Sequence, residues 1–316
     1  MPDPTPATDA RRERGTLRIG RIAGVDVLVR SSWLIVAVLI AVLVAPAVER
    51  ATPGLGAWRY VAGIAFAVLL YLSVLVHEMS HALMARRYGL PVRSITLHFM
   101  GGVTEIDGEP DTPGREFGVS VVGPLTSLGL GLVFLLLCPV TPDGLLRLAV
   151  EMLAGANLIV GVLNLVPGLP LDGGRVLRAG VWKATGDPHR ATIVAGWGGR
   201  VAAGAALAYP LGRQIATGTP TSVTDYILAF VISTFLWGGA SAAILSGKVR
   251  RRLPVLSARS LARRTASPSG RSCGTESVRR ARLRAESMGR RRRTLPDRIA
   301  ALAPPHRNVA ITNARM

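Results

Sequence analysis

Residues 60–87 have the sequence YVAGIAFAVLLYLSVLVHEMSHALMARR, an apolar run that ends in a short polar cluster. Seventeen uncharged residues come first, and His77, Glu78 and His81 follow within the same helical pattern. A helix of this length is long enough to enter a hydrocarbon layer about 30 Å thick. Ionisable side chains at such a depth are energetically costly and are usually functional. The segment therefore predicts a membrane-spanning helix that carries a polar site.

Five more apolar stretches of comparable length accompany this one. They cover residues 31–48, 117–138, 148–171, 191–211 and 226–246, so that the sequence predicts six membrane spans in all. Hydrophobic residues make up 49% of the 316 residues, and the mean hydropathy is +0.36. A single soluble domain rarely has this composition. We therefore expect an all-α polytopic membrane protein, which excludes a soluble enzyme.

The basic residues of the connecting segments predict the orientation of the spans. Fourteen Lys and Arg residues lie in the N-terminal segment and in the second and fourth connections, whereas four lie in the connections on the opposite side. Basic loops stay on the cytoplasmic side of a membrane. We therefore expect a multi-pass protein of the cell membrane with both termini in the cytoplasm, and residues 1–30 form a cytoplasmic segment before the membrane domain of residues 31–247.

Residues 92–106 depart from the helical pattern. Ile95, Leu97 and Phe99 alternate with polar residues, Gly101-Gly102 marks a turn, and residues 103–106 can return. This pattern predicts a short β-hairpin beside the second span. Non-helical backbone at membrane depth needs protein or water around it, so we expect the hairpin to line a cavity. His98 lies on this hairpin; we expect a structural role for it, with an approach to the cavity as the alternative.

The motif HEMSH at residues 77–81 is typical of a metal site. His77 and His81 are four residues apart, so both imidazoles project from one face of a helix and can hold one ion. Glu78 points about 100° away from His77. It is therefore a poor ligand, but it is placed to act as a general base. A catalytic zinc ion takes three protein ligands and keeps one position open, so a third ligand is needed.

The candidate third ligand lies in NLVPGLPLDGG, residues 164–174. Pro167 and Pro170 break the fourth span near its end, which holds Asp172 on irregular backbone at the same depth as the two histidines. An unpaired carboxylate at that depth is unfavourable, and coordination of zinc removes this cost. The alternative is that Asp172 pairs with Arg175 or Arg178. Asn164, at the start of this motif, can also pack between helices.

Together these motifs resemble the site-2 protease family of intramembrane zinc metalloproteases, in its bacterial six-span form. The resemblance rests on the HEMSH motif, the residue 164–174 motif, the Gly101-Gly102 hairpin and Gly123-Pro124 in the third span, and it covers about residues 15–247. It implies a three-span catalytic core and one zinc ion per chain, bound by His77, His81 and Asp172, with Glu78 as the catalytic base.

The same resemblance implies the substrate and the cellular role. The expected substrate is a single-span membrane protein such as an anti-sigma factor, which is cleaved within its membrane segment during regulated intramembrane proteolysis. Asn164 is expected to hydrogen-bond the substrate backbone or the developing oxyanion. Gly101 and Gly102 are expected to present a strand edge to an unwound substrate. Membrane lipids are expected partners, and nucleic acid is not.

Residues 248–316 differ from the rest of the chain. They carry 16 of the 19 net positive charges, with few apolar residues in any regular pattern. Such a composition predicts a disordered basic tail. Members of the six-span subgroup often continue into CBS domains, and residues 253–264 resemble the beginning of one. The remainder then represents a truncated or out-of-frame CBS region, or a polybasic tail that binds anionic lipid.

Two other classes of membrane protein are weighed against a protease. A transporter or metal carrier needs paired inverted repeats, whereas the HEMSH and LDGG motifs each occur once. A scaffold without catalytic activity does not require the three expected zinc ligands or the expected base, and all four residues are present: His77, His81, Asp172 and Glu78. Substitution of Glu78 by alanine separates a protease from a carrier, because only the protease needs the base.

Overall fold

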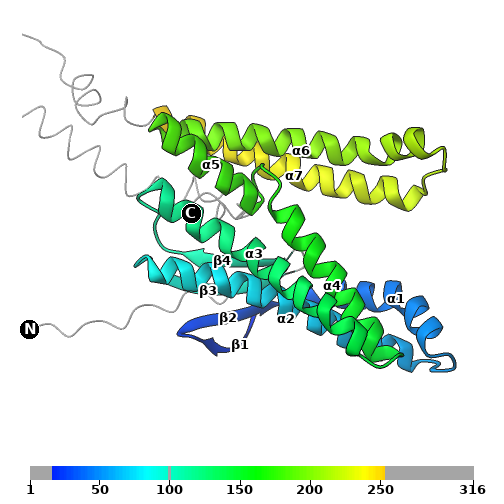
Figure 1. Ribbon diagram of the computed structural model, residues 1–316. Helices are drawn as coiled ribbons and strands as arrows, with labels where there is room; N and C mark the ends of the chain where they lie inside the picture. The colour runs from blue at the N-terminus through cyan, green and yellow to red at the C-terminus, as the bar shows by residue number, and fades with distance from the viewer. Residues whose placement is uncertain (1–15, 99–100, 253–316) are drawn as a thin grey trace, which may run out of the picture. The chain divides into compact units, whose positions relative to one another are not determined.

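The computed structural model describes residues 16–98 and 101–252, and six long apolar helices dominate this part of the chain (Figure 1). They are α1 (Trp33–Ala51), α2 (Trp58–Arg87), α3 (Pro113–Leu137), α4 (Leu145–Asn164), α6 (Pro188–Thr217) and α7 (Val223–Arg252). A short 3₁₀ turn, η1 (Cys138–Val140), extends α3. Each long helix is long and apolar enough to cross a membrane, so the six predicted spans are confirmed. Residues 1–15 and most of the predicted basic tail lie outside the described residues; α7 includes residues 248–252 of that tail.

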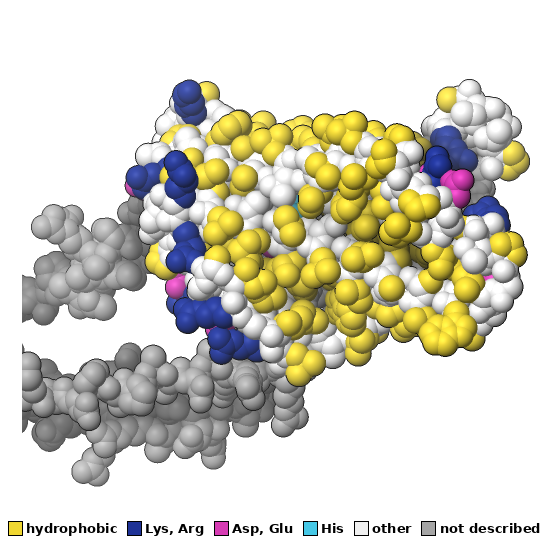
Figure 2. All heavy atoms as spheres, turned by 60° about the horizontal axis from the view of Figure 1, so that its bottom comes forward, with side chains coloured by type: hydrophobic (Ala, Val, Ile, Leu, Met, Phe, Trp, Pro, Cys, Tyr) yellow, Lys and Arg dark blue, Asp and Glu magenta, His cyan; other side chains and the backbone are white. Residues whose placement is uncertain are grey.

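The outer surface of the helices is apolar. Figure 2 shows hydrophobic side chains across the middle of the visible face, with Lys and Arg gathered toward its two ends. Large residues such as Leu136 and Val201 are about 70% exposed, as are many others along these helices. An apolar patch of this extent is unusual on a soluble monomer. The surface is that of a multi-pass membrane protein.

The connection after α4 contains a helix that the sequence analysis did not predict. α4 ends at Asn164, and residues 165–171 have no helical structure, as Pro167 and Pro170 predict. The seventh helix, α5 (Asp172–Thr185), begins immediately afterwards. Its first turn contains Gly173 and Gly174, which are poor helix formers, and this is why its sequence pattern is weak. Both glycines are buried against the backbone of residues 165–169, where a Cβ atom would lie within 2.4 Å of a backbone atom.

A four-stranded sheet lies beside α2. The predicted hairpin is confirmed as β3 (Val92–His98) and β4 (Gly101–Ile106), although residues 99–100 at its turn lie outside the description. The sequence analysis missed two further strands in the N-terminal segment, β1 (Thr16–Ile22) and β2 (Val25–Arg30). The order is β1-β2-β3-β4, with β2 parallel to β3 and the other pairs antiparallel. The predicted hairpin is thus part of a larger sheet, and the parallel pairing of β2 with β3 joins segments that are far apart in the chain.

The core fixes the polar end of α2 between this sheet and α3. Val25, Ile95 and Leu97 of the sheet pack with Tyr71 and Ala82 of α2 in one buried cluster. Glycines bring the helices together elsewhere: a Cβ atom on Gly63 of α2 would lie 2.6 Å from the Cα atom of Ala41 in α1. Close approach at small residues is typical of membrane helices. The result is a rigid frame around His77, Glu78 and His81.

Candidate metal centre

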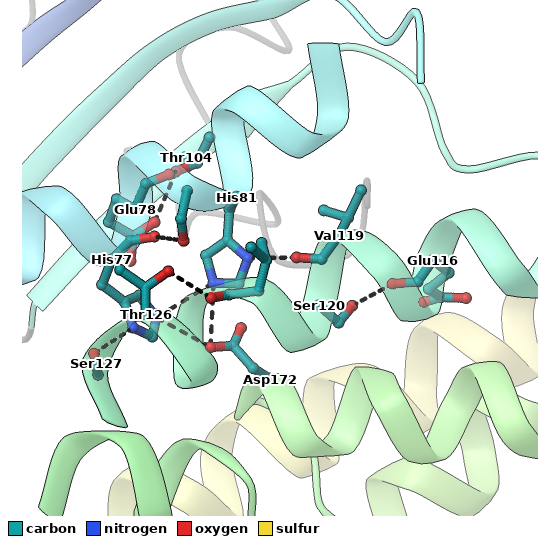
Figure 3. Close-up of polar contacts among 12 residues, drawn as sticks. His77, Glu78, His81, Thr104, Glu116, Val119, Ser120, Thr126, Ser127 and Asp172 are labelled. Atoms are coloured by element: carbon teal, nitrogen blue, oxygen red, sulfur yellow. Dashed lines mark hydrogen bonds and ion pairs between the residues drawn. The ribbon is translucent and has the colours of Figure 1, made fainter. Parts of the chain in front are cut away.

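Three side chains from two helices converge beside α3. His77 and His81 project from α2, and Asp172 is the first residue of α5 (Figure 3). The Nε2 atoms of the two histidines are 3.2 Å apart. The Asp172 Oδ2 atom lies 3.2 Å from His77 Nε2 and 3.3 Å from His81 Nε2. These ligand atoms all lie within 4.8 Å of one another. The structure thus brings the three predicted ligands together.

Gly123 of α3 leaves space in front of both imidazoles. A Cβ atom built on Gly123 would lie 2.2 Å from His81 Nε2 and 2.8 Å from His77 Nε2. Zinc binds histidine nitrogen at about 2.0–2.1 Å, so the missing side chain is in the volume that an ion would need. Two imidazoles and one carboxylate are a common donor set for a catalytic zinc ion. The residues therefore fit such an ion.

The other ring nitrogens of the two histidines contact α3. His81 Nδ1 lies 2.6 Å from the Val119 carbonyl oxygen, and His77 Nδ1 lies 2.9 Å from Ser127 Oγ. A carbonyl oxygen only accepts, so Nδ1 of His81 donates this hydrogen bond, and Nε2 is the ring nitrogen left to bind an ion. The Ser127 hydroxyl can accept from His77 in the same way. Such contacts orient the ligands of a metal and fix their tautomers.

We expect substitution of Ser127 by alanine to lower zinc affinity by about 10–100-fold, the usual effect of losing a hydrogen bond that orients a ligand. Competition with a chromophoric chelator measures this affinity. Ser120→Ala is the matched control, because that hydroxyl, also on α3, donates to the Glu116 carbonyl oxygen of its own helix. Equal affinities for the two variants would contradict the role of Ser127.

Glu78 lies apart from the three converging side chains. Its carboxylate faces β4, where the Thr104 hydroxyl donates to Oε2 at 2.7 Å (Figure 3). The Glu78 side chain lies very close to the β4 backbone, since a Cβ atom on Gly102 would lie 2.3 Å from Glu78 Cγ. Glu78 therefore lies against β4 and is not one of the three clustered side chains. Thr104 was missed in the sequence, because nothing in a strand pattern marks which threonine will meet the helix.

The remaining predicted residues are not part of the cluster. Asn164 is the half-buried last residue of α4, where the irregular segment toward Asp172 begins. Gly101 and Gly102 open β4, and Gly101 has a φ of +122° that a side chain would disfavour. His98 ends β3, and its carbonyl oxygen accepts from the Tyr71 hydroxyl. Arg178, one of the alternative partners of Asp172, instead pairs with Glu116.

Comparison with known proteins gives a consistent set of similarities. The family model of peptidase family M50 matches residues 65–143 and 142–203. "Putative zinc metalloprotease Rip3" of Mycobacterium tuberculosis is 40% identical over 210 residues, which are 65% of this chain and 53% of that protein. "Zinc metalloprotease MJ0392" of Methanocaldococcus jannaschii is 35% identical over 134 residues, 42% of this chain and 38% of that one.

A solved structure has the same fold. The "Site-2 Protease from Methanocaldococcus jannaschii" superposes with a TM-score of 0.51 at 26% sequence identity, covering 72% of this chain and 95% of that one. This chain spans about half the length of the curated relatives that it matches first. The residues matched by the family model run from within α2 to within α6 and include α3, α4 and α5, and therefore all the residues of the centre.

Proposed function

Because this chain belongs to the site-2 protease family, peptidase family M50, we propose that it is an intramembrane zinc metalloendopeptidase. It hydrolyses a peptide bond within the membrane segment of a membrane-anchored substrate. The observation that carries this proposal is the convergence of His77, His81 and Asp172 from two helices, with Glu78 beside them. One zinc ion per chain, held by those three side chains, fits the donor set.

Each residue then has a role in hydrolysis. A bound zinc ion supplies a Lewis acid that polarises the substrate carbonyl and makes water a better nucleophile. The Glu78 carboxylate accepts a proton from the attacking water and passes it to the leaving amine. The Thr104 hydroxyl holds Oε2 of that carboxylate, which leaves Oε1 as the proton acceptor. Gly102 lets the Glu78 side chain lie flat against β4.

The sheet suggests how the substrate is held. β4 is an edge strand, so its outer backbone groups are not paired within the sheet. An unwound substrate segment can add to such an edge as a further strand, beginning at Gly101 and Gly102. Asn164 then hydrogen-bonds the substrate backbone. A helical peptide bond is shielded by its own hydrogen bonds, so the substrate must unwind before Glu78 can act.

The location and the partners are part of the same proposal. The asymmetry of basic residues favours the cell membrane with both termini in the cytoplasm. The proposed organisation is a cytoplasmic segment of residues 1–30, a protease domain of residues 31–247 and a basic region of residues 248–316. The substrate class is a single-span membrane protein such as an anti-sigma factor, cleaved in regulated intramembrane proteolysis.

The test uses the full chain purified in detergent. We expect elemental analysis to find one zinc ion per chain, and we expect cleavage of members of a panel of single-span bacterial membrane proteins that includes anti-sigma factors. A chelator should abolish cleavage, and added zinc should restore it, because His77, His81 and Asp172 then lose and regain their ion. Cleavage that continues in protein shown to be free of metal contradicts the proposal, as does zinc-loaded protein that cleaves no member of the panel.

A further inference from the structure

α3 contributes no ligand to the metal centre, but it contacts both helices that do. Val119 and Ser127 of α3 meet the two histidines of α2. A third contact, from the first turn of α3, reaches α5. Glu116 is completely buried there, and its Oε1 atom accepts from Arg178 Nη1 at 2.8 Å. Arg178 lies on α5, six residues after Asp172.

Arg178 joins two carboxylates at once. Its Nη2 atom also lies 3.5 Å from Oε2 of Glu109, which is in the segment between β4 and α3. The guanidinium is only about 9% exposed and lies near the Trp182 ring of its own helix, 6.0 Å from the ring centre. A planar guanidinium can direct its two Nη groups to two acceptors in fixed directions, which an ammonium group cannot do. The contact is therefore directional as well as charged.

α5 packs against α3 and α6, and the Arg178–Glu116 pair adds a directional side-chain contact to that packing. Its first turn packs through Gly173 and Gly174 on the backbone of residues 165–169, and that segment has no regular structure. Contacts between glycines and backbone determine how closely the helix approaches, but they include no directional side-chain bond. The Arg178–Glu116 pair, little more than one turn farther along α5, is anchored to the same helix that orients both histidines.

We propose that the Glu116–Arg178 pair positions Asp172, by fixing the rotation of α5 on α3 so that the carboxylate meets both imidazoles. Glu116 and Arg178 are positioning residues in this view and do not touch the substrate. The inference rests on the proposed function, since it takes Asp172 to be the third zinc ligand. With the pair intact, α3 sets all three ligands: His81 through Val119, His77 through Ser127 and Asp172 through Glu116.

The test measures metal binding in the full-length chain, with Arg178→Gln, Glu116→Gln and the double variant. We expect each single variant to bind zinc about 10–100-fold more weakly, as when an outer partner of a metal ligand is lost. After Co²⁺ loading, the visible spectrum of each single variant should differ from that of the unsubstituted chain, because the spectrum reports how many ligands surround the ion. The double variant should bind hardly more weakly than either single variant, since the two residues act as a unit.

Arg147→Gln is the matched control. Arg147 also pairs with two carboxylates, Asp143 and Glu151, but these contacts are exposed and lie around the start of α4. We expect its zinc affinity and Co²⁺ spectrum to equal those of the unsubstituted chain. Arg178→Lys keeps the charge without the planar group, so it should fold and show an intermediate loss of affinity.

Zinc affinity and a Co²⁺ spectrum unchanged from the unsubstituted chain, in folded Arg178→Gln or in Arg178→Lys, would overturn this inference. Neither measurement requires a substrate. An unsubstituted chain that binds one zinc ion but cleaves no membrane protein therefore overturns the proposed function and leaves the positioning role intact. Cleavage by the unsubstituted chain, together with normal metal binding by both Arg178 variants, overturns the positioning role and leaves the proposed function intact.

Discussion

Glu78→Ala is expected to lower the rate of peptide cleavage by about 10²–10⁴-fold, the usual contribution of a general base, while zinc stays bound at one ion per chain. The two effects separate because Glu78 is not among the converging ligands. Its carboxylate lies on the β4 side of α2, where Thr104 holds it at 2.7 Å. Cleavage rate and zinc content are measured on the same preparation.

Glu151→Ala is the control for this substitution. Glu151 is also a carboxylate of a long apolar helix, α4, but it is exposed and its Oε1 atom accepts from Arg147 of the same helix at 3.0 Å. We expect its cleavage rate to match that of the unsubstituted chain. Loss of zinc in Glu78→Ala would show that Glu78 is a ligand, and cleavage at the normal rate would show that the base is another residue. A metal carrier, in contrast, would keep most of its transport.

Gly123→Ala is expected to remove metal binding altogether. The added methyl group would lie 2.2 Å from His81 Nε2 and 2.8 Å from His77 Nε2, where a zinc ion would have to lie. The loss of affinity should therefore exceed the roughly 10–100-fold that follows loss of a supporting hydrogen bond. Alanine is a better helix former than glycine by about 1 kcal/mol, so helix propensity does not weaken α3. Elemental analysis and chelator competition measure the effect, and cleavage should be lost with the metal.

Gly129→Ala is the matched control, because it makes the same change in the same helix. A Cβ atom on Gly129 would meet nothing within 4 Å. We expect this variant to bind one zinc ion with normal affinity. Stoichiometric, tight zinc binding by Gly123→Ala would mean that the ion lies away from the two Nε2 atoms, and it would contradict the centre described above.

The elements that the sequence predicts well are those with a local signal. Each long helix follows from a long apolar run, and the β3–β4 hairpin follows from alternation around Gly101-Gly102. His77 and His81 share a helix face because they are four residues apart, which helical geometry alone determines. Asp172 was tied to them through the proline-interrupted end of α4 and a family resemblance, and the structure places its carboxylate beside both imidazoles.

Other features depend on contacts between segments far apart in the chain, and the sequence shows no sign of them. β2 pairs in parallel with β3, and both α1 and α2 lie between these two strands in the sequence. Neither β1 nor β2 was therefore predicted. α5 forms in spite of the two glycines in its first turn, because the loop before it, α3 and α6 pack around it. Sequence alone therefore predicted the candidate ligands, because helical spacing pairs the two histidines and the motif of residues 164–174 supplies Asp172. Only the tertiary structure decided what orients them, because Val119, Ser127 and Glu116 acquire their roles from the packing of α3 against α2 and α5.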